Sequence, residues 1–177
     1  RYAKFRGYIK VMNYSIILYI VGKVMMLESA CFLIPAVTSL IYGEHEGMAY
    51  LIVGAVSAII GHLISSKKKF ENVFFAREGF VMVALSWIVL SVVGAIPFVL
   101  TGEIPNMVDA LFETVSGFTT TGASILEDVE SLSHTALIWR SFTHWVGGMG
   151  VIVLLLAILP MAGGYNMHLM KAESPGP

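Results

Sequence analysis

Residues 111–124 read Leu111-Phe112-Glu113-Thr114-Val115-Ser116-Gly117-Phe118-Thr119-Thr120-Thr121-Gly122-Ala123-Ser124 and lie between two long apolar segments. This stretch is too polar and too rich in glycine and threonine to be a membrane-spanning helix. Its first half can form a short helix, whereas its second half favours extended backbone, because threonine is β-branched and glycine is flexible. Extended backbone at membrane depth is tolerated only where protein buries it or where it lines a water-filled path. A short helix followed by extended Thr-Gly backbone is how an ion selectivity filter is built.

The composition indicates an all-α membrane protein. Of the 177 residues, 56% are apolar and 13% are charged, whereas a soluble domain carries about 25% charged residues. The single cysteine, Cys31, gives neither a disulfide framework nor a zinc motif. Because the chain starts at Arg1 without an initiator methionine, we expect it to be part of a longer polypeptide.

Four apolar segments are long enough to cross a bilayer. They cover residues 24–42 (with the helix beginning near residue 11 and kinked at Pro35), 48–66, 79–100 and about 134–162. Lys and Arg are concentrated in two of the connecting segments. Residues 1–12 and 67–77 hold four each, and the loops 43–47 and 101–133 hold none. The positive-inside rule therefore predicts that both termini are cytoplasmic and that the two acidic loops face outward.

The loop after the third span is predicted to be re-entrant. The chain leaves and re-enters the membrane on the outer side between residues 100 and 134, so residues 105–126 dip inward and return. Asn106 is a strong helix N-cap, which predicts a pore helix over about 106–117. The carbonyl end of that helix points inward and attracts a cation. The alternative is a long outer loop that carries an amphipathic surface helix.

Residues 119–123 are the predicted filter, and their carbonyl oxygens can surround a dehydrated cation. Gly122 can adopt backbone angles that strain other residues. Acidic residues follow and precede this segment, and they would raise the local cation concentration: Glu103, Glu127, Asp128 and Glu130. A ring of carbonyls needs about four copies of such a segment. Either the chain forms a tetramer, or the complete polypeptide carries further related units.

Several sequence motifs, taken in their order along the chain, resemble those of the TrkH-type membrane subunit of bacterial potassium uptake systems. This subunit belongs to the Trk/Ktr/HKT superfamily. The motifs are SGFTTTGA (116–123), WRSFT (139–143), WVGGMG (145–150), AILP (157–160) and KAESPGP (171–177). The resemblance implies four pore units in one polypeptide, arranged pseudo-fourfold around one pore. The present chain would be its N-terminal third, without the later unit that carries the gating loop.

The resemblance also implies a domain organisation, an ion and partners. Residues 1–66 would form a basic segment and a two-helix leader, 67–78 a cytoplasmic loop, and 79–177 the first span–pore–span unit. K⁺ would bind at Thr119, Thr120, Thr121, Gly122 and Ala123, with the Thr120 and Thr121 carbonyls as the main contacts. The implied partners are further pore units, a second copy in a homodimer, a cytoplasmic nucleotide-binding TrkA-like subunit and the bilayer of the bacterial inner membrane. No nucleic-acid partner is expected.

Three ionisable residues within the spans have alternative interpretations. Arg140 can pair with Glu113 and so stabilise the filter, or it can face the outer vestibule. Glu28 is either a coupling or ion site, or a carboxylate that reaches the interface or pairs with Lys23. His144 is either a proton relay or a polar residue in helix packing.

Three functions are considered for a chain with these features. Cation permeation would use the pore segment. A membrane enzyme is not expected, because no pair of histidines or carboxylates is spaced so that both side chains would lie on one face of a helix. The remaining alternative is a non-conducting membrane anchor or assembly module. On any of these interpretations, the isolated chain is not expected to conduct.

Overall fold

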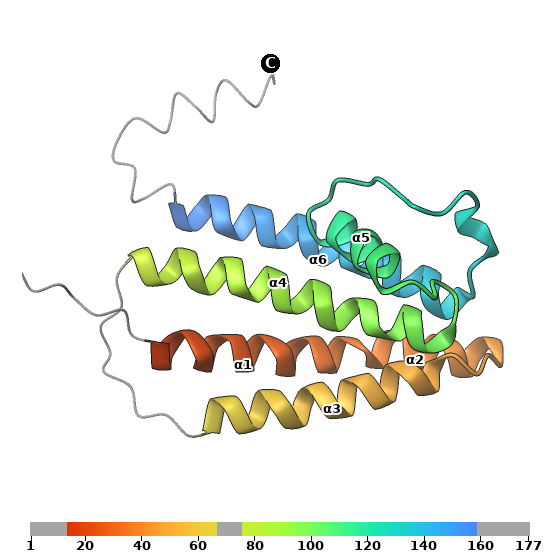
Figure 1. Ribbon diagram of the computed structural model, residues 1–177, viewed down its shortest axis with the longest axis horizontal. Helices are drawn as coiled ribbons and strands as arrows, with labels where there is room; N and C mark the ends of the chain where they lie inside the picture. Colours follow the sequence, from red (N-terminus) through yellow and green to blue (C-terminus); the bar gives the residue numbers. More distant parts are fainter. Residues whose placement is uncertain (1–13, 67–75, 159–177) are drawn as a thin grey trace, which may run out of the picture.

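The computed structural model describes residues 14–66 and 76–158, and the regular secondary structure of this part of the chain is helical. The helices are α1 (Tyr14–Cys31), α2 (Leu33–Tyr42), α3 (Gly47–Ser66), α4 (Ala76–Thr101), α5 (Met107–Phe118) and α6 (His134–Ile158), with a short 3₁₀ turn η1 (Val129–Ser131). The basic segment 1–12 and most of the basic loop 67–78 lie outside the described residues. In Figure 1, α1, α3, α4 and α6 run side by side, and α5 lies across the halves of α4 and α6 that are nearest the acidic loops.

The first three expected spans are confirmed as helices whose length and composition suit a membrane crossing. Among the described residues, three helical stretches are long and apolar enough to cross a membrane: Tyr14–Tyr42, Gly47–Ser66 and Gly79–Thr101. The fourth expected span corresponds to α6, which has 25 residues. The end of that span, residues 159–162, lies outside the described residues, so its crossing of the bilayer stays a prediction.

The first span is interrupted at Phe32, between α1 and α2. Proline lacks an N–H group, and its ring crowds the carbonyl of the residue four positions earlier. For Pro35 that carbonyl belongs to Cys31, the last residue of α1. The helical path continues across the break, because Phe32 N donates to Glu28 O (3.1 Å) and Ala36 N donates to Phe32 O (3.2 Å). The structure thus shows an interruption three residues before Pro35, and the kink expected at Pro35 stays a prediction.

Small residues allow α1 and α3 to pack closely. A Cβ atom added to Gly22 would lie 2.7 Å from the Gly61 carbonyl oxygen, and one added to Gly61 would lie 2.6 Å from the Gly22 oxygen. Membrane helices associate through such small-residue contacts, since lipid gives them no hydrophobic driving force. Gly43 then ends α2 in the left-handed conformation (φ 71°) and starts the short loop to α3.

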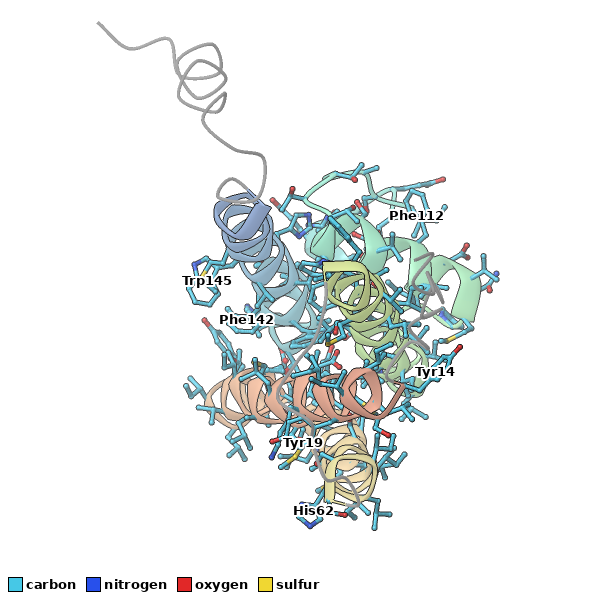
Figure 2. The ribbon with its side chains drawn as sticks, turned by 90° about the vertical axis from the view of Figure 1, so that its left-hand side faces the viewer. Tyr14, Tyr19, His62, Phe112, Phe142 and Trp145 are labelled. Carbon is cyan, nitrogen blue, oxygen red and sulfur yellow. The ribbon has the colours of Figure 1, made fainter. Side chains whose placement is uncertain are left out.

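Trp139 of α6 forms the centre of the main core. Its side chain is 1% exposed, its ring centroid lies 4.5 Å from that of Phe32 and 6.2 Å from that of Tyr50, and its Nε1 donates to Gly94 O at 3.0 Å. Helices α3, α4 and α6 and the junction of α1 with α2 therefore meet at one side chain. In the end-on view of Figure 2, α6 and α4 lie on one side of α1 and α3 lies on the other. The leader helices and the segment after residue 76 thus share a core.

Candidate functional site

Helix α5 begins where the sequence predicts it. Asn106 has extended backbone, and its Oδ1 accepts a hydrogen bond from Val108 N at 2.9 Å. The Asn106 carbonyl accepts the Ala110 N–H at 2.9 Å, and Asp109 lies in the first turn. An asparagine cap followed by an acidic residue stabilises a helix N-terminus by pairing its free N–H groups and by favourable interaction with its dipole.

The end of α5 lies beside the middle of the two helices that flank it. Phe118 is 3% exposed, and its ring centroid lies 6.0 Å from that of Trp87 in α4. On α6, a Cβ atom added to Gly147 would overlap the Phe118 carbonyl oxygen. Because α5 begins next to the end of α4 and stops about halfway along α4 and α6, the chain must turn back at this point.

The chain reverses through a tight C-cap. Thr121 N donates to Ser116 O, and Thr120 N donates to Gly117 O, each at 2.9 Å. This hydrogen-bond pair defines the Schellman motif, which needs a left-handed residue that is usually glycine. Here that residue is Thr120, with φ 56°. Left-handed backbone is strained for a β-branched residue, and such strain is concentrated at functional sites.

The expectation of extended backbone from residue 119 onward is therefore wrong for the first two threonines. Thr119 is in the right-handed helical region (φ −88°, ψ 0°) and Thr120 is left-handed, so the loop starts with a turn. The capping of α5 determines this turn, because it pairs carbonyls at the helix end that would otherwise be free. The positive φ expected for Gly122 is observed at 75°.

Three consecutive carbonyl groups of this loop are unpaired. Among the described residues, no hydrogen bond is donated to the carbonyl oxygens of Thr120, Thr121 or Gly122, and these three residues are exposed. The carbonyls on either side do have donors. Thr119 O accepts Thr120 Oγ1 at 2.7 Å, and Ala123 O accepts Ser116 Oγ at 2.5 Å. Within residues 119–123, the carbonyls without a donor are therefore the middle three.

Glu113 fixes the far end of the loop to the helices. Its side chain is 1% exposed. Its carboxylate accepts Ser124 Oγ at 3.1 and 3.2 Å, Ile125 N at 3.1 Å and Arg140 Nε at 2.5 Å. The ion pair expected between Glu113 and Arg140 is therefore present. Arg140 is partly buried, with 18% of its side chain exposed, so it lies against α5 and the loop.

Several acidic residues lie on the segments before and after the predicted filter. Glu127, Asp128 and Glu130 are on the loop that leads to α6, and Glu127 follows the predicted filter by four residues. Glu103 is half-buried, and one of its carboxylate oxygens accepts Ser133 N at 3.2 Å. Burial raises the pKa of Glu103 above its ordinary value, nearby Glu46 and Glu44 raise it further, and the hydrogen bonding to Ser133 only partly offsets these effects.

Glu28 neither reaches the interface nor pairs with Lys23, and the interpretation as a coupling or ion site stays a prediction. Its side chain is 3% exposed, so it does not reach the interface, and among the described residues neither carboxylate oxygen has a hydrogen-bond partner. Lys23 is exposed, and its ammonium lies over the Tyr19 ring, 5.5 Å from the centroid. The expected pair with Lys23 is therefore wrong. Glu28 instead borders an apolar cavity of about 250 Å³ that also contacts Trp139 and Trp145.

Two further residues on α6 have clear structural roles. His144 Nδ1 lies 3.0 Å from the carbonyl oxygen of Arg140 one turn earlier, which agrees with a role in packing. A Cβ atom added to Gly150 would lie 2.6 Å from the Trp87 ring, so this glycine allows close contact between α6 and α4. Figure 2 shows Phe142 and Trp145 on the side of α6 away from Phe112 of α5.

Sequence reasoning did not identify Glu44, Ser116 or Ser124 as parts of this site. The two serines hydrogen-bond to Ala123 O and to Glu113, as described above. Glu44 reaches the start of α6 across 90 positions of sequence. A local pattern cannot signal such a distant contact, although the acidic loop that holds Glu44 is evident in the sequence.

Comparison with known proteins gives one consistent result. Residues 46–177 match the family described as TrkH, cation transport protein. The chain is 43% identical over 169 residues to the Trk system potassium uptake protein TrkH of Escherichia coli K12, covering 94% of this chain and 35% of the relative. It is 37% identical over 164 residues to Trk system potassium uptake protein TrkG of the same organism, covering 92% of this chain and 34% of the relative.

A solved structure shows the same fold. The crystal structure of the potassium transporter TrkH from Vibrio parahaemolyticus superimposes with a TM-score of 0.81 at 35% sequence identity, covering 88% of this chain and 34% of that chain. The present chain thus spans about a third of the length of the proteins it matches, and it corresponds to their N-terminal portion.

Proposed function

The chain belongs to the TrkH family of cation transport proteins, and from this we propose that it supplies the leader and first pore unit of a potassium uptake protein. K⁺ would pass through a filter of backbone carbonyls to which residues 119–123 contribute one side. The names of the relatives, potassium uptake proteins, support K⁺ as the transported ion. A ring of carbonyls takes about four such segments, so we assign the others to the rest of the polypeptide.

One observation carries this proposal. The carbonyls of Thr120, Thr121 and Gly122 have no donor among the described residues and lie in an exposed loop beside the middle of two long apolar helices. An unpaired backbone carbonyl in an apolar surrounding is unfavourable by several kcal/mol. A dehydrated cation supplies the missing partner. The fixed ends of the loop, at the Schellman turn and at Glu113, would hold the carbonyls ready for it.

The electrostatics agree with a cation in this position. The carbonyl end of α5 carries about half a negative charge from the aligned peptide dipoles, and no basic residue in its last turn offsets that charge. The acidic Glu127, Asp128 and Glu130 on the adjoining loop would attract cations to the entrance. The Glu113–Arg140 pair beside the filter adds no net charge, and we assign it the role of keeping the loop in shape.

The family also suggests the setting of the protein. We infer a multi-pass location in the bacterial inner membrane, with residues 1–12 and 67–77 on the cytoplasmic side. A homodimer and a cytoplasmic nucleotide-binding TrkA-like subunit are the partners that this family leads us to expect. The domain division at residues 66 and 78 follows the same reasoning, with the first pore unit starting at residue 79.

The test replaces Gly122 by Ser in the full-length protein that contains this chain. Gly102 is a matched control, because it also has positive φ (79° against 75°) and open space around an added Cβ atom. Left-handed backbone disfavours a non-glycine residue by about 1–2 kcal/mol at either position. The strain is therefore similar, but only Gly122 lies in the proposed filter.

We expect Gly122→Ser to abolish potassium-dependent growth of bacteria that lack other potassium uptake systems. Gly102→Ser should support growth, with both proteins present at equal amounts in the membrane. If both variants support growth at wild-type rates, residues 119–123 do not form a filter. That result would favour the alternative of a non-conducting anchor or assembly module.

A further inference from the structure

Glu44 caps a helix that begins 90 residues later in the chain. It lies in the loop between α2 and α3, and its carboxylate accepts four hydrogen bonds from the first two residues of α6. The donors are His134 N and Nδ1, each at 2.9 Å, Thr135 N at 2.9 Å and Thr135 Oγ1 at 2.5 Å. A carboxylate at this position satisfies free N–H groups and interacts favourably with the helix dipole.

The loop that presents Glu44 is itself fixed. Glu44 N donates to Ser39 O at 2.9 Å, and Ser39 Oγ donates to Glu44 O at 2.7 Å and accepts from Gly47 N at 3.1 Å. The rings of Tyr42 and His134 stack with centroids 3.9 Å apart and planes 8° apart. The loop between α2 and α3 of the two-helix leader and the start of α6 are therefore held together as one rigid unit.

Capping alone does not explain this contact, because α6 already has a local cap. Ser133 Oγ accepts Ala136 N at 3.1 Å, and Ser133 O accepts Leu137 N at 2.9 Å. What Glu44 adds is a connection between the leader and the helix that carries Arg140. Partial burial of Glu44 opposes ionisation, but the hydrogen bonds from Thr135 and His134 outweigh it and lower its pKa to about 2. The carboxylate is therefore charged at neutral pH.

The connection continues to the proposed filter. Arg140 follows Thr135 by five residues, about 7.5 Å along a helix. Its guanidinium binds Glu113, and Glu113 binds Ser124 and Ile125 at the end of the loop. An α-helix is stiff over this length. The position of the first turn of α6 therefore determines where Arg140 lies along the helix axis relative to Glu113.

We propose that Glu44 is a positioning residue for the cation pathway, holding the start of α6 so that Arg140 keeps Glu113 and the loop 119–125 in place. This role rests on the proposed function. It assigns the two-helix leader a part in ion selection, although within the described part of the chain no hydrogen bond joins the leader to the loop that would bind the ion.

The test compares Glu44→Gln with Glu46→Gln in the full-length protein. Both variants remove one carboxylate from the same outer loop, but Glu46 makes none of the contacts to α6 described above. The amide introduced in place of the Glu44 carboxylate would face two donors of α6 with an N–H group. We expect the KM for K⁺ to rise about fivefold, the equivalent of about 1 kcal/mol, and the ratio of Rb⁺ to K⁺ uptake to change. Glu46→Gln should change neither quantity.

A second variant covers the case in which Glu44→Gln does not fold. Thr135→Val keeps the shape of the side chain and removes one of the four hydrogen bonds. We expect it to shift KM and the uptake ratio in the same direction as Glu44→Gln, by a smaller factor. The double variant should be no worse than Glu44→Gln alone, because both changes act through one contact.

The outcomes separate this proposal from the one it rests on. If wild-type protein takes up K⁺ and the variants only lower its amount in the membrane, with KM and the Rb⁺ to K⁺ ratio unchanged, Glu44 is a structural cap and the positioning role is refuted. If the wild-type protein takes up no K⁺, the proposed function itself fails.

Discussion

Replacement of Arg140 by Gln removes the only charged partner that Glu113 has in the described part of the chain. The Glu113 side chain is 1% exposed, and it would retain Ser124 Oγ and Ile125 N as donors. Loss of one member of a buried ion pair typically destabilises a protein by about 3–5 kcal/mol. We expect the low end, about 3 kcal/mol, because two donors remain and Arg140 is 18% exposed to solvent.

This magnitude predicts the effect on transport. At about 1.4 kcal/mol per factor of ten, about 3 kcal/mol changes the equilibrium between a fixed and a released loop by about 100-fold. We therefore expect Arg140→Gln to lower rubidium uptake at limiting substrate by about tenfold to 100-fold. The lower bound applies if neighbouring pore units hold part of the loop in place.

The assay is uptake of radioactive rubidium by bacteria that lack other potassium uptake systems, normalised to the amount of full-length protein in the membrane. Ser141→Ala is the control, because Ser141 is the exposed neighbour of Arg140. The double variant Arg140→Gln with Glu113→Gln should recover part of the activity, since no charge is then left unpaired. Wild-type uptake and wild-type preference for K⁺ over Na⁺ in Arg140→Gln would refute the role assigned to the pair.

Three further predictions concern packing and charge. Gly147→Ala should lower both the melting temperature of the full-length protein and its potassium uptake, because the new Cβ would overlap the backbone oxygen of Phe118. Gly148→Ala is the control and should change neither quantity, because the atom nearest to its new Cβ is 4.0 Å away. Glu28→Met should raise the melting temperature, because it replaces a buried carboxyl that has no partner among the described residues; a lower melting temperature would show that the carboxyl is used. Ionised Glu44 should stabilise the protein above about pH 4.5, and this contribution should be lost as the pH falls towards 2, because the folded pKa is about 2 against an ordinary 4.5. The difference in melting temperature between wild type and Glu44→Gln should therefore shrink as the buffer is acidified below about pH 4.5.

Helix boundaries were predictable wherever local chemistry determines them. The cap at Asn106 set the start of α5 to within one residue, and α3 was expected from residue 48 and begins at Gly47. An apolar run and a capping side chain act over a few residues, so the sequence alone contains this information. Pro35 predicted a kink for the same reason, although the interruption itself falls on Phe32.

The conformation of the loop was only partly predictable. The sequence predicted that the pore helix ends at about residue 117, because threonine is a poor helix residue, and α5 ends one residue later at Phe118. The left-handed Thr120 was not foreseen, because the preference of threonine for φ below zero is overridden by two hydrogen bonds that exist only once α5 has formed. Gly122 was foreseen, because there the intrinsic preference of glycine and the required backbone geometry agree.

Contacts between distant segments could not be read from the sequence with the same certainty. Arg140 and Glu113 were paired correctly because both are charges in apolar surroundings and few partners exist for them. Lys23 and Glu28 met the same criterion and are not paired. Spacing of five residues places two side chains about 140° apart around a helix, so proximity in sequence does not bring them together. The contact of Glu44 with α6 has no local sequence signal, because its partners lie 90 positions away and two of them are backbone groups.

The contacts of α6 suggest a route by which a substitution at Glu44 would affect the proposed filter. The helix is held at three levels: by Glu44 at His134, by Phe32 and Gly94 at Trp139, and by Phe118 at Gly147. From the first to the third level the helix rises about 20 Å. The middle contact combines packing of the Trp139 ring with a hydrogen bond to Gly94 O, and the contact at Gly147 is with a backbone oxygen. On the positioning role proposed for Glu44, release of α6 at His134 should displace Arg140, which lies between the first and third contacts, relative to Glu113.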